Sequence, residues 1–465
     1  MNIEIIFGPP GTGKTTRLQE LLIKELEAGT NIQEIAYVSF TREGTYQGKR
    51  RAQESLGLSE RDMPWFRTLH SIAFNSLRMR RSDMIKKENY KTFSDKMGMK
   101  FTGYYTEDFR HNDDRYLFFD ILHRENPKTA ANYLYDLDIK KLKFVRQNYK
   151  QFKEYFQVYD FTDLIQLYNK NNNSLPVKIA FIDEAQDLTT LQWQMIWIAF
   201  RNCEKIYIAG DDDQAIYEWS GADVKYFLTL QGNQTILNHS YRLPKRILRY
   251  AKKITELIEH RVPKEYTGIE EEGEVALINS IKELDLNNNE SWLFLSRNHY
   301  FLQEIISYLK TQSYVFMHRK DISVSKQKVD AINLFEKIRK TMIMSPDQER
   351  ILQKHIKGIR LDLNHPWYHN FNWPVEDIMY YRDLIGNKID LKKCNITIDT
   401  IHSVKGGEAD NVVLFSDITK QVVTNLQNNP DSERRVFYVG ATRAKKKLYI
   451  VSPTNKYEFP LRSYL

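Results

Sequence analysis

The sequence predicts an α/β protein built on parallel sheets. Short apolar runs typical of buried parallel strands recur along the chain, the first over Ile3–Phe7. That run leads into a glycine-rich turn and then into a helix-forming stretch, Arg17–Glu27. Two later apolar runs end in acidic residues, at Asp183 and at Asp211. Strands followed by polar turns and helices are typical of this class.

Length and composition limit the remaining classes. A chain of 465 residues is too long for one compact core and predicts two to four domains. A composition of 42% hydrophobic and 28% charged residues is that of an ordinary globular protein. No apolar run approaches the roughly 20 residues that span a membrane, and no signal peptide precedes the first strand. The two cysteines, Cys203 and Cys394, predict neither a zinc site nor a disulfide framework, which suits a reducing cytoplasm.

The charge balance points to a polyanionic partner. The formal net charge is +8, and the basic residues are clustered. Each cluster by itself is typical of a solvated helix face, but together they favour a polyanion, and the 13% of aromatic residues supply faces for stacking on single-stranded nucleic acid. The clusters are Lys49–Arg51, Arg78–Arg81 with Lys86–Lys87, Lys140–Lys150 and Lys445–Lys447.

The glycine-rich turn fits the P-loop pattern and predicts a nucleoside triphosphate site. Gly11 and Gly13 permit backbone angles that turn N–H groups around a phosphate, and the following helix directs its positive end at the same group. Lys14 is expected to reach the β- and γ-phosphates and the Thr15 hydroxyl to contact Mg²⁺. The alternative is a glycine-rich turn without a ligand. The predicted phosphate-binding residues are Gly8, Pro9, Pro10, Gly11, Thr12, Gly13, Lys14, Thr15 and Thr16.

The two acidic strand ends predict the remaining hydrolytic groups. In VKIAFIDEAQD (Val177–Asp187), Asp183 is expected to hold Mg²⁺ and Glu184 to deprotonate the attacking water. A third strand, Lys205–Ala209, leads into GDDDQAIYEW (Gly210–Trp219). Its three consecutive acids repel one another, so a structural role is not expected unless cations or donors lie near. Gln214 both donates and accepts, which suits sensing a γ-phosphate or its water.

Six motifs, in order from residue 8 to residue 444, resemble those of a superfamily 1 helicase of the UvrD/Rep type. The resemblance implies two RecA-like P-loop motor domains with parallel sheets, each carrying a mostly helical inserted subdomain, with ATP in the cleft between the motors. The motifs are GPPGTGKT, DEAQD, GDDDQAIYEW, SYR (Ser240–Arg242), TIDTIHSVKGGEADNVVL (Thr397–Leu414) and VFYVGATRA (Val436–Ala444).

The resemblance also assigns roles. Arg242 and Arg443 match two arginines that reach the γ-phosphate and stabilise the transition state. Gln214 matches the glutamine that links ATP to DNA, and Glu408 an acidic residue near the ribose. Without the resemblance, Arg443 would be one basic residue in a Lys/Arg-rich helix. The positions that match the single-strand track, where rings stack on bases and Thr or His bonds phosphates, are Phe40, Thr41, His70, Tyr217, Trp219 and His402. For Tyr217 and Trp219, packing in the core is the alternative.

The domain boundaries follow from the motifs and the composition. We expect the first motor domain over 1–71 and 174–235, with a helical insertion over 72–173. The second is expected over 236–313 and 394–465, with a small insertion over 314–393. Strands are expected at Ser291–Ser296, Ile396–Ile398, Asn411–Phe415 and Lys447–Val451. The insertion has a helical first half, Val329–Lys357, and an aromatic patch, Pro366–Trp373, interpreted as core packing or as a contact to duplex at the fork.

The function that the resemblance implies is an ATP- and Mg²⁺-dependent DNA helicase moving 3′→5′ on single-stranded DNA. We expect a cytoplasmic monomer, in a bacterium or a phage-infected host, that acts at junctions of single and double strands with replication or recombination proteins as partners. The chain starts almost at the first strand, so no upstream segment reads adenine and other nucleoside triphosphates are expected to serve. A protein-displacing translocase, the motor of a helicase–nuclease, a non-catalytic binding module and an RNA substrate are the alternatives.

Overall fold

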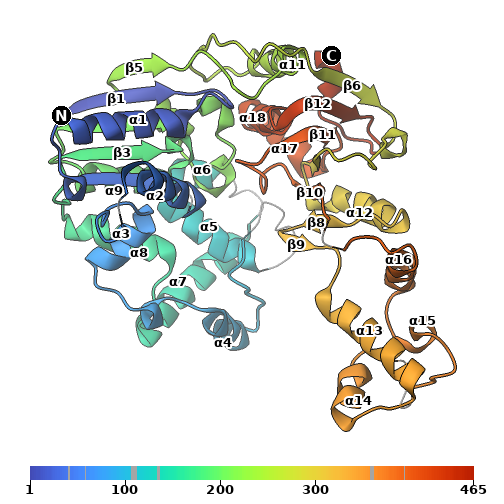
Figure 1. Cartoon of the computed structure of the whole chain (residues 1–465). Helices are drawn as coiled ribbons and strands as arrows, with labels where there is room; N and C mark the ends of the chain where they lie inside the picture. The colour runs from blue at the N-terminus through green and yellow to red at the C-terminus, as the bar shows by residue number, and fades with distance from the viewer. Residues whose placement is uncertain (40–41, 58, 106–112, 133–136, 357–360, 392) are drawn as a thin grey trace. The chain divides into compact units, whose positions relative to one another are not determined.

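The computed structural model describes residues 1–39, 42–57, 59–105, 113–132, 137–356, 361–391 and 393–465 (Figure 1). These residues form two compact units. Unit 1 comprises Met1–Glu272 and Asn425–Val439, and unit 2 comprises Gly273–Thr424 and Gly440–Leu465. This division differs from the boundaries expected from the sequence at residues 236–272 and 425–439, which pack with unit 1. None of the helices in the described ranges is long and apolar enough to cross a membrane.

Unit 1 is built on a five-stranded parallel sheet with the strand order β2-β3-β4-β1-β5. Every residue of β2 and β3 is buried, as expected for parallel strands that are covered on both faces. All four residues of β5 are exposed, so this edge strand carries no apolar signal in the sequence. The strands are β1 Asn2–Phe7, β2 Ile35–Ser39, β3 Ile179–Asp183, β4 Lys205–Gly210 and β5 Asn233–Ile236.

Helices cover both faces of this sheet. On one face, Leu18, Leu21 and Leu22 of α1 follow the helical spacing and pack against strand residues such as Ile6. On the other face, α3, α8 and α9 pack over strand residues that alternate with the first set. The helices around this sheet are α1 Lys14–Glu27, α2 Arg42–Leu56, α3 Leu69–Ser76, α8 Phe161–Asn171, α9 Thr190–Ala199 and α10 Val224–Leu228. Unit 1 also contains α11 Lys245–Thr255 and all but the last two residues of α18 Pro430–Ala441.

The helical insertion has a core of its own. Buried aromatic side chains such as Phe93, Tyr116 and Tyr149 form it, and Trp219 packs against its edge. The rings supply a large apolar area to a subdomain whose surface is strongly charged. Its helices are α4 Lys87–Met97, α5 Asp114–Glu125, α6 Pro127–Ala131 and α7 Ile139–Phe156.

Unit 2 contains a seven-stranded sheet with the order β6-β12-β11-β7-β10-β8-β9, parallel except for the β8–β9 pair. The mixed α/β class with parallel sheets is therefore confirmed. The strands are β6 Glu274–Ile278, β7 Trp292–Ser296, β8 Phe316–His318, β9 Asp321–Ile322, β10 Ile396–Thr400, β11 Ala409–Phe415 and β12 Ala444–Val451. The helices are α12 Leu302–Thr311, α13 Lys326–Thr341, α14 Pro346–Gln353, α15 Trp367–Asn370, α16 Val375–Gly386 and α17 Lys420–Asn428.

Two local expectations for unit 2 are decided by the structure. In the aromatic patch, Trp367 and Phe371 are 4% and 0% exposed in a core formed by α13–α16, so core packing is the correct interpretation for these rings. The expectation of a Lys/Arg-rich helix around Arg443 is wrong. α18 ends at Ala441 and β12 begins at Ala444, so Arg443 lies in the turn and Lys445–Lys447 lie on the strand. None of the three lysines is buried, and the buried residues of β12 are Ala444, Leu448, Ile450 and Val451.

Candidate nucleotide-binding site

The P-loop joins β1 to α1 in a conformation that only glycine adopts without strain. Gly11 and Gly13 have φ values of 73° and 80°, and Gly13 is the N-cap of α1. A Cβ at Gly8 would overlap the stem of Lys14, whose Nζ donates a 2.7 Å hydrogen bond to the Gly8 carbonyl. The loop is braced by Thr12, whose hydroxyl donates to the Pro9 carbonyl at 2.8 Å. The lysine thus lies folded over a loop that opens at the N-terminus of a helix.

Asp183 connects this loop to the carboxyl end of β3. Its carboxylate accepts hydrogen bonds of 2.9 Å from the Thr15 hydroxyl and 2.9 Å from the Tyr37 hydroxyl, and the residue is 2% exposed. Burial, followed by the charge of Glu184, raises the pKa of Asp183 to about 6. A buried carboxyl group that is short of positive charge is a fitting ligand for a cation.

The ligand set suits Mg²⁺ bound together with a nucleotide. Among the described ranges no group of three or more His, Cys, Asp or Glu side chains is arranged to hold a metal ion. Mg²⁺ commonly takes one or two protein oxygens and completes its octahedron with phosphate and water. The hydroxyl of Thr15 and the carboxylate of Asp183 supply such oxygens side by side.

Glu184 is held in a strained position next to Asp183. Its φ of 55° is left-handed, a conformation that costs a non-glycine residue on the order of 1–3 kcal/mol. Its carboxylate accepts a short hydrogen bond from Gln186 Nε2, and the Oε1 of the same Gln186 accepts from the Asp211 N–H at 3.0 Å. Gln186 therefore ties the predicted base to the end of β4. Gln186 is not among the residues predicted from the sequence, although it stands in DEAQD two residues after the base.

The three consecutive acids after β4 are neutralised by cations from a distant segment. The side chains of Asp211, Asp212 and Asp213 are at most 1% exposed, and the Nζ of Lys264, 0% exposed, lies 3.3, 2.5 and 2.9 Å from them. Arg261 forms two hydrogen bonds with Asp213, at 2.9 and 2.7 Å. The three acids therefore have nearby cations, which is the condition under which a structural role is expected for them. Gln214, 6% exposed, is fixed in turn because its Nε2 donates to Asp211.

Ser240–Arg242 packs directly against the P-loop. The Ser240 hydroxyl donates to the Pro10 carbonyl at 2.6 Å, and the Tyr241 N–H donates to the Gly11 carbonyl at 2.9 Å. A Cβ at Gly11 would lie 2.5 Å from the Cβ of Arg242, so the absence of a side chain there lets the segments touch. Arg242 therefore lies beside the loop.

The other predicted nucleotide residues belong to unit 2. Arg443 is 1% exposed, and its guanidinium donates to the Gly407 carbonyl and to the Thr442 hydroxyl, both at 3.3 Å. Glu408 is exposed and forms an ion pair with Lys445 at 3.6 Å. His402, predicted for the single-strand track, is 7% exposed in the turn after β10.

The remaining single-strand candidates lie in unit 1 or outside the described residues. His70, on α3, meets the ring of Phe161 edge-on at 5.5 Å. Trp219 stacks on Phe118 with centroids 5.9 Å apart, so one of its faces is covered. Tyr217 is partly buried, two residues earlier. Phe40 and Thr41 lie outside the described residues.

Comparisons with known proteins agree with the motifs. The family model of the UvrD/REP helicase N-terminal domain matches residues 2–235, and that of the UvrD-like helicase C-terminal domain matches residues 369–455. The ATP-dependent DNA helicase PcrA of Staphylococcus aureus is 24% identical over 287 residues, 56% of this chain and 39% of that protein. PcrA of Bacillus subtilis is 26% identical over 300 residues, 58% of this chain and 39% of that protein.

A solved structure described as the PRRSV helicase aligns with 98% of this chain and 53% of its own, at 12% identity and a TM-score of 0.39.

The chain matches about two fifths of the length of the PcrA proteins. The model of the N-terminal domain covers half of the chain, and the resemblance inferred from the motifs is confirmed. The chain belongs to the UvrD/REP helicase family.

Proposed function

We propose that this protein hydrolyses ATP in order to move along single-stranded DNA and to separate duplex strands. The observation that carries the proposal is the hydrogen bond from Thr15 to Asp183, with Glu184 next in the chain. It joins a glycine-rich phosphate loop, a set of metal-binding oxygens and a candidate base within one unit of a UvrD/REP-family chain.

Hydrolysis would use the groups at this corner of the first sheet. The N–H groups of the loop and the N-terminus of α1 would bind the phosphates, and Lys14 would exchange the Gly8 carbonyl for a phosphate oxygen. Thr15 and Asp183 would hold Mg²⁺, which supplies charge neutralisation on the β- and γ-phosphates. Glu184, oriented by Gln186, would accept the proton of the attacking water.

The residues around Gln214 would couple the nucleotide to DNA. Gln214 is bonded to Asp211 at the end of β4, and Trp219 follows five residues later against the helical insertion. A change at the γ-phosphate would therefore reach an aromatic position of the proposed DNA track through a short stretch of chain. Arg242 lies beside the loop and is proposed as a γ-phosphate ligand, and the same role for Arg443 stays a prediction.

Movement from 3′ to 5′, a monomeric motor, junction substrates and the use of nucleotides other than ATP are further parts of the proposal. The PcrA relatives are described as ATP-dependent DNA helicases, which supports DNA as the substrate. The aromatic content and positive net charge agree with a single-stranded polyanion.

The test is strand separation on partial duplexes that carry a 3′ or a 5′ single-stranded tail, with ATP and Mg²⁺. Glu184→Gln serves as the control that binds nucleotide and hydrolyses it at least 100-fold more slowly. Unwinding from the 3′ tail is the expected result. Unwinding from the 5′ tail refutes the polarity. Stimulated hydrolysis without strand separation favours the translocase, and no stimulation by single strands refutes the proposal.

A further inference from the structure

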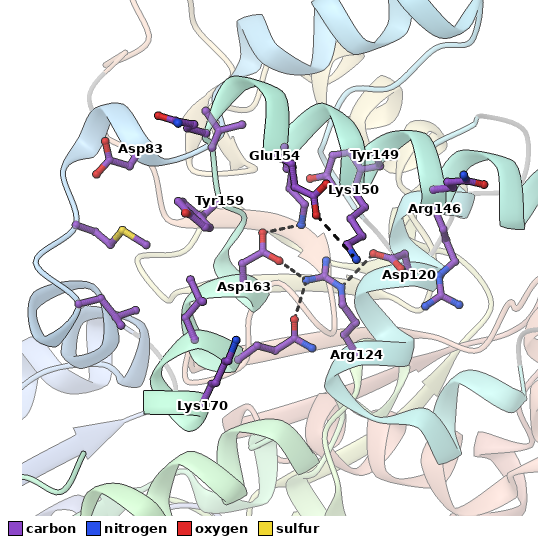
Figure 2. Close-up of a pocket in the computed structure, with 18 of the residues that line it drawn as sticks. Asp83, Asp120, Arg124, Arg146, Tyr149, Lys150, Glu154, Tyr159, Asp163 and Lys170 are labelled. Carbon is purple, nitrogen blue, oxygen red and sulfur yellow. Dashed lines mark hydrogen bonds and ion pairs between the residues drawn. The ribbon is translucent and has the colours of Figure 1, made fainter. Parts of the chain in front are cut away.

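A large hollow that the nucleotide site does not use lies between the helical insertion and α8. It has a volume of about 1370 Å³ and is lined by residues from the segment that follows α3, from α5, from α7, and from α8 with the turn before it (Figure 2). This exceeds the roughly 300–1,000 Å³ of pockets that enclose a small molecule. Eight basic and four acidic side chains line it, which leaves a formal surplus of positive charge.

The floor of the hollow is an ion-pair network that is already neutral. Arg124 contacts Asp120 at 3.0 Å, Asp160 at 2.7 Å and Asp163 at 2.9 Å. Lys153 bridges Asp160 and Asp163 at 2.7 and 2.6 Å. Figure 2 shows Arg124 between Asp120 and Asp163 at the centre of the view. Arg146 contacts Asp120 at 2.7 Å, so three cations meet three carboxylates. Although burial raises the pKa of Asp160, Arg124 and Lys153 hold it below its usual range.

The surplus charge lies on the rim. In the parts of the chain that the structure describes, Arg78, Lys143 and Lys170 take part in no ion pair, and all three are exposed. Lys150 reaches Glu154 only at 3.9 Å. Exposed, flexible cations above a neutral floor are suited to binding several phosphates. The partly buried ring of Tyr159, on the wall, adds a face on which a base can stack.

The hollow is close to a residue of the proposed DNA track. His70 lies near the start of α3, and Arg78 follows just after the end of that helix. Eight residues at about 1.5 Å per residue place them roughly 12 Å apart. α8 makes the same connection, because Phe161 at its start contacts His70 and Lys170 near its end lines the hollow.

We propose that this hollow is a second nucleic-acid site, which binds the sugar–phosphate backbone of a single strand through Arg78, Lys143 and Lys170. A flexible strand can follow a concave surface. Duplex DNA, with a persistence length of about 50 nm, contacts only the rim of one. The inference rests on the proposed function, because a helicase presents two single strands: the tail on which it moves and the strand that it displaces.

The test compares two double variants of equal charge. Lys143→Ala/Lys170→Ala removes two rim cations, and Lys91→Ala/Lys128→Ala removes two exposed lysines from α4 and α6 outside the hollow. Binding is measured by fluorescence anisotropy at several salt concentrations. The ligands are short and long oligothymidylate, a duplex with one tail, a fork with two arms, a blunt duplex and polyglutamate.

For the ligand that enters the hollow, we compare the slope of the logarithm of the binding constant against the logarithm of the salt concentration. The magnitude of this slope should be smaller for the rim variant than for the wild type by about 1.4, because each of two lost phosphate contacts contributes about 0.7. Between about 50 and 200 mM salt, wild-type affinity should then fall about sevenfold more than that of the rim variant. An effect on long oligothymidylate and on the tailed duplex alike identifies the tail, and an effect that needs the second arm identifies the displaced strand.

Equal behaviour of the two double variants on every single-stranded ligand overturns the inference. An effect confined to blunt duplex or to polyglutamate also overturns it, in favour of a duplex surface or an acidic protein partner. Hydrolysis of ATP by the wild type, with and without short oligothymidylate, reports separately on the proposed function. A protein that is stimulated normally but shows no rim effect retains that function and loses this site.

Discussion

Replacing Lys264 with methionine should destabilise unit 1 by about 3–5 kcal/mol, the usual cost of removing one partner from a buried ion pair. The Nζ of Lys264 is enclosed and lies within 3.3 Å of carboxylate oxygens of Asp211, Asp212 and Asp213. Methionine keeps the volume of the side chain and removes the charge. Arg261, bound to Asp213 at 2.7 Å, would then face all three carboxylates.

The loss should depend on pH in a definite direction. Burial raises the pKa of Asp212 to about 6, and Lys264 is the largest influence that opposes this rise. Because the folded pKa exceeds the ordinary pKa of an aspartate, 3.8, the stability associated with this proton is present below pH 3.8 and is lost as pH rises through 6. Without Lys264 the pKa rises further, so the variant takes up a proton at a pH where the wild type does not. The destabilisation should be smaller at pH 5 than at pH 8 by about 1–2 kcal/mol, at about 1.4 kcal/mol per pKa unit.

Equilibrium unfolding in urea at both pH values, followed by tryptophan fluorescence, measures these losses. Lys245→Met is the matched control, because this lysine of α11 is 43% exposed and pairs with Glu270 at the surface. It should change the free energy of unfolding by less than about 0.5 kcal/mol. A loss below about 1 kcal/mol for Lys264→Met, or an equal loss at pH 5 and pH 8, would refute the electrostatic account of the three acids.

Further predictions follow from other contacts in the two units. Gln186→Ala should lower kcat for ATP hydrolysis by about 10- to 100-fold with little change in KM, since it releases Glu184; an equal rise in KM would contradict this. Titrations of ATPase activity with Mg²⁺ should show a weaker apparent affinity for the metal below pH 6, because protons compete with Mg²⁺ for the Asp183 carboxylate. Since the pKa of this carboxyl is raised in the folded protein, Asp183→Asn should increase the free energy of unfolding of the metal-free protein at pH 8 but not at pH 4. Trp367→Ala should cost about 3–5 kcal/mol in unfolding experiments, whereas exposed Tyr300→Ala should cost under about 1 kcal/mol.

The parts of the fold that could be predicted from the sequence are those that local patterns specify. A short, mostly apolar run that ends in glycine or an acidic residue describes a buried parallel strand, and β1, β3 and β4 begin and end within two residues of the runs expected from the sequence. The conformation of the P-loop is likewise local, because positive φ at Gly11 and Gly13 depends on neighbours in the chain. β5 could not be found, since its four residues are exposed and have no apolar periodicity.

Local sequence patterns do not predict which segments far apart in the chain pack against one another. Residues 236–272 and 425–439, which are expected in the second motor domain, fall within compact unit 1. Ser240 donates to the Pro10 carbonyl of the P-loop, and Arg261 and Lys264 pair with the acids after β4. α18 is linked in turn to this segment, because the Tyr266 and Tyr438 hydroxyls meet at 3.0 Å and the guanidinium of Arg435 donates to the His260 carbonyl. These interactions join positions up to 230 residues apart, and no spacing rule within a motif encodes them.

The three acids after β4 nevertheless carried information about such a distant contact. Carboxylates at the end of a buried strand need counter-charges, so Asp211, Asp212 and Asp213 require cations elsewhere in the chain, brought there by folding. Lys264 stands in the short stretch RVPKEY, between Pro263 and Glu265, and lies outside the runs of consecutive basic residues. A buried acidic run therefore predicts that a lysine or arginine elsewhere in the chain will be buried as its partner. The need of buried carboxylates for a counter-charge thus constrains which distant segments pack together, whereas hydrophobic periodicity constrains only the local element.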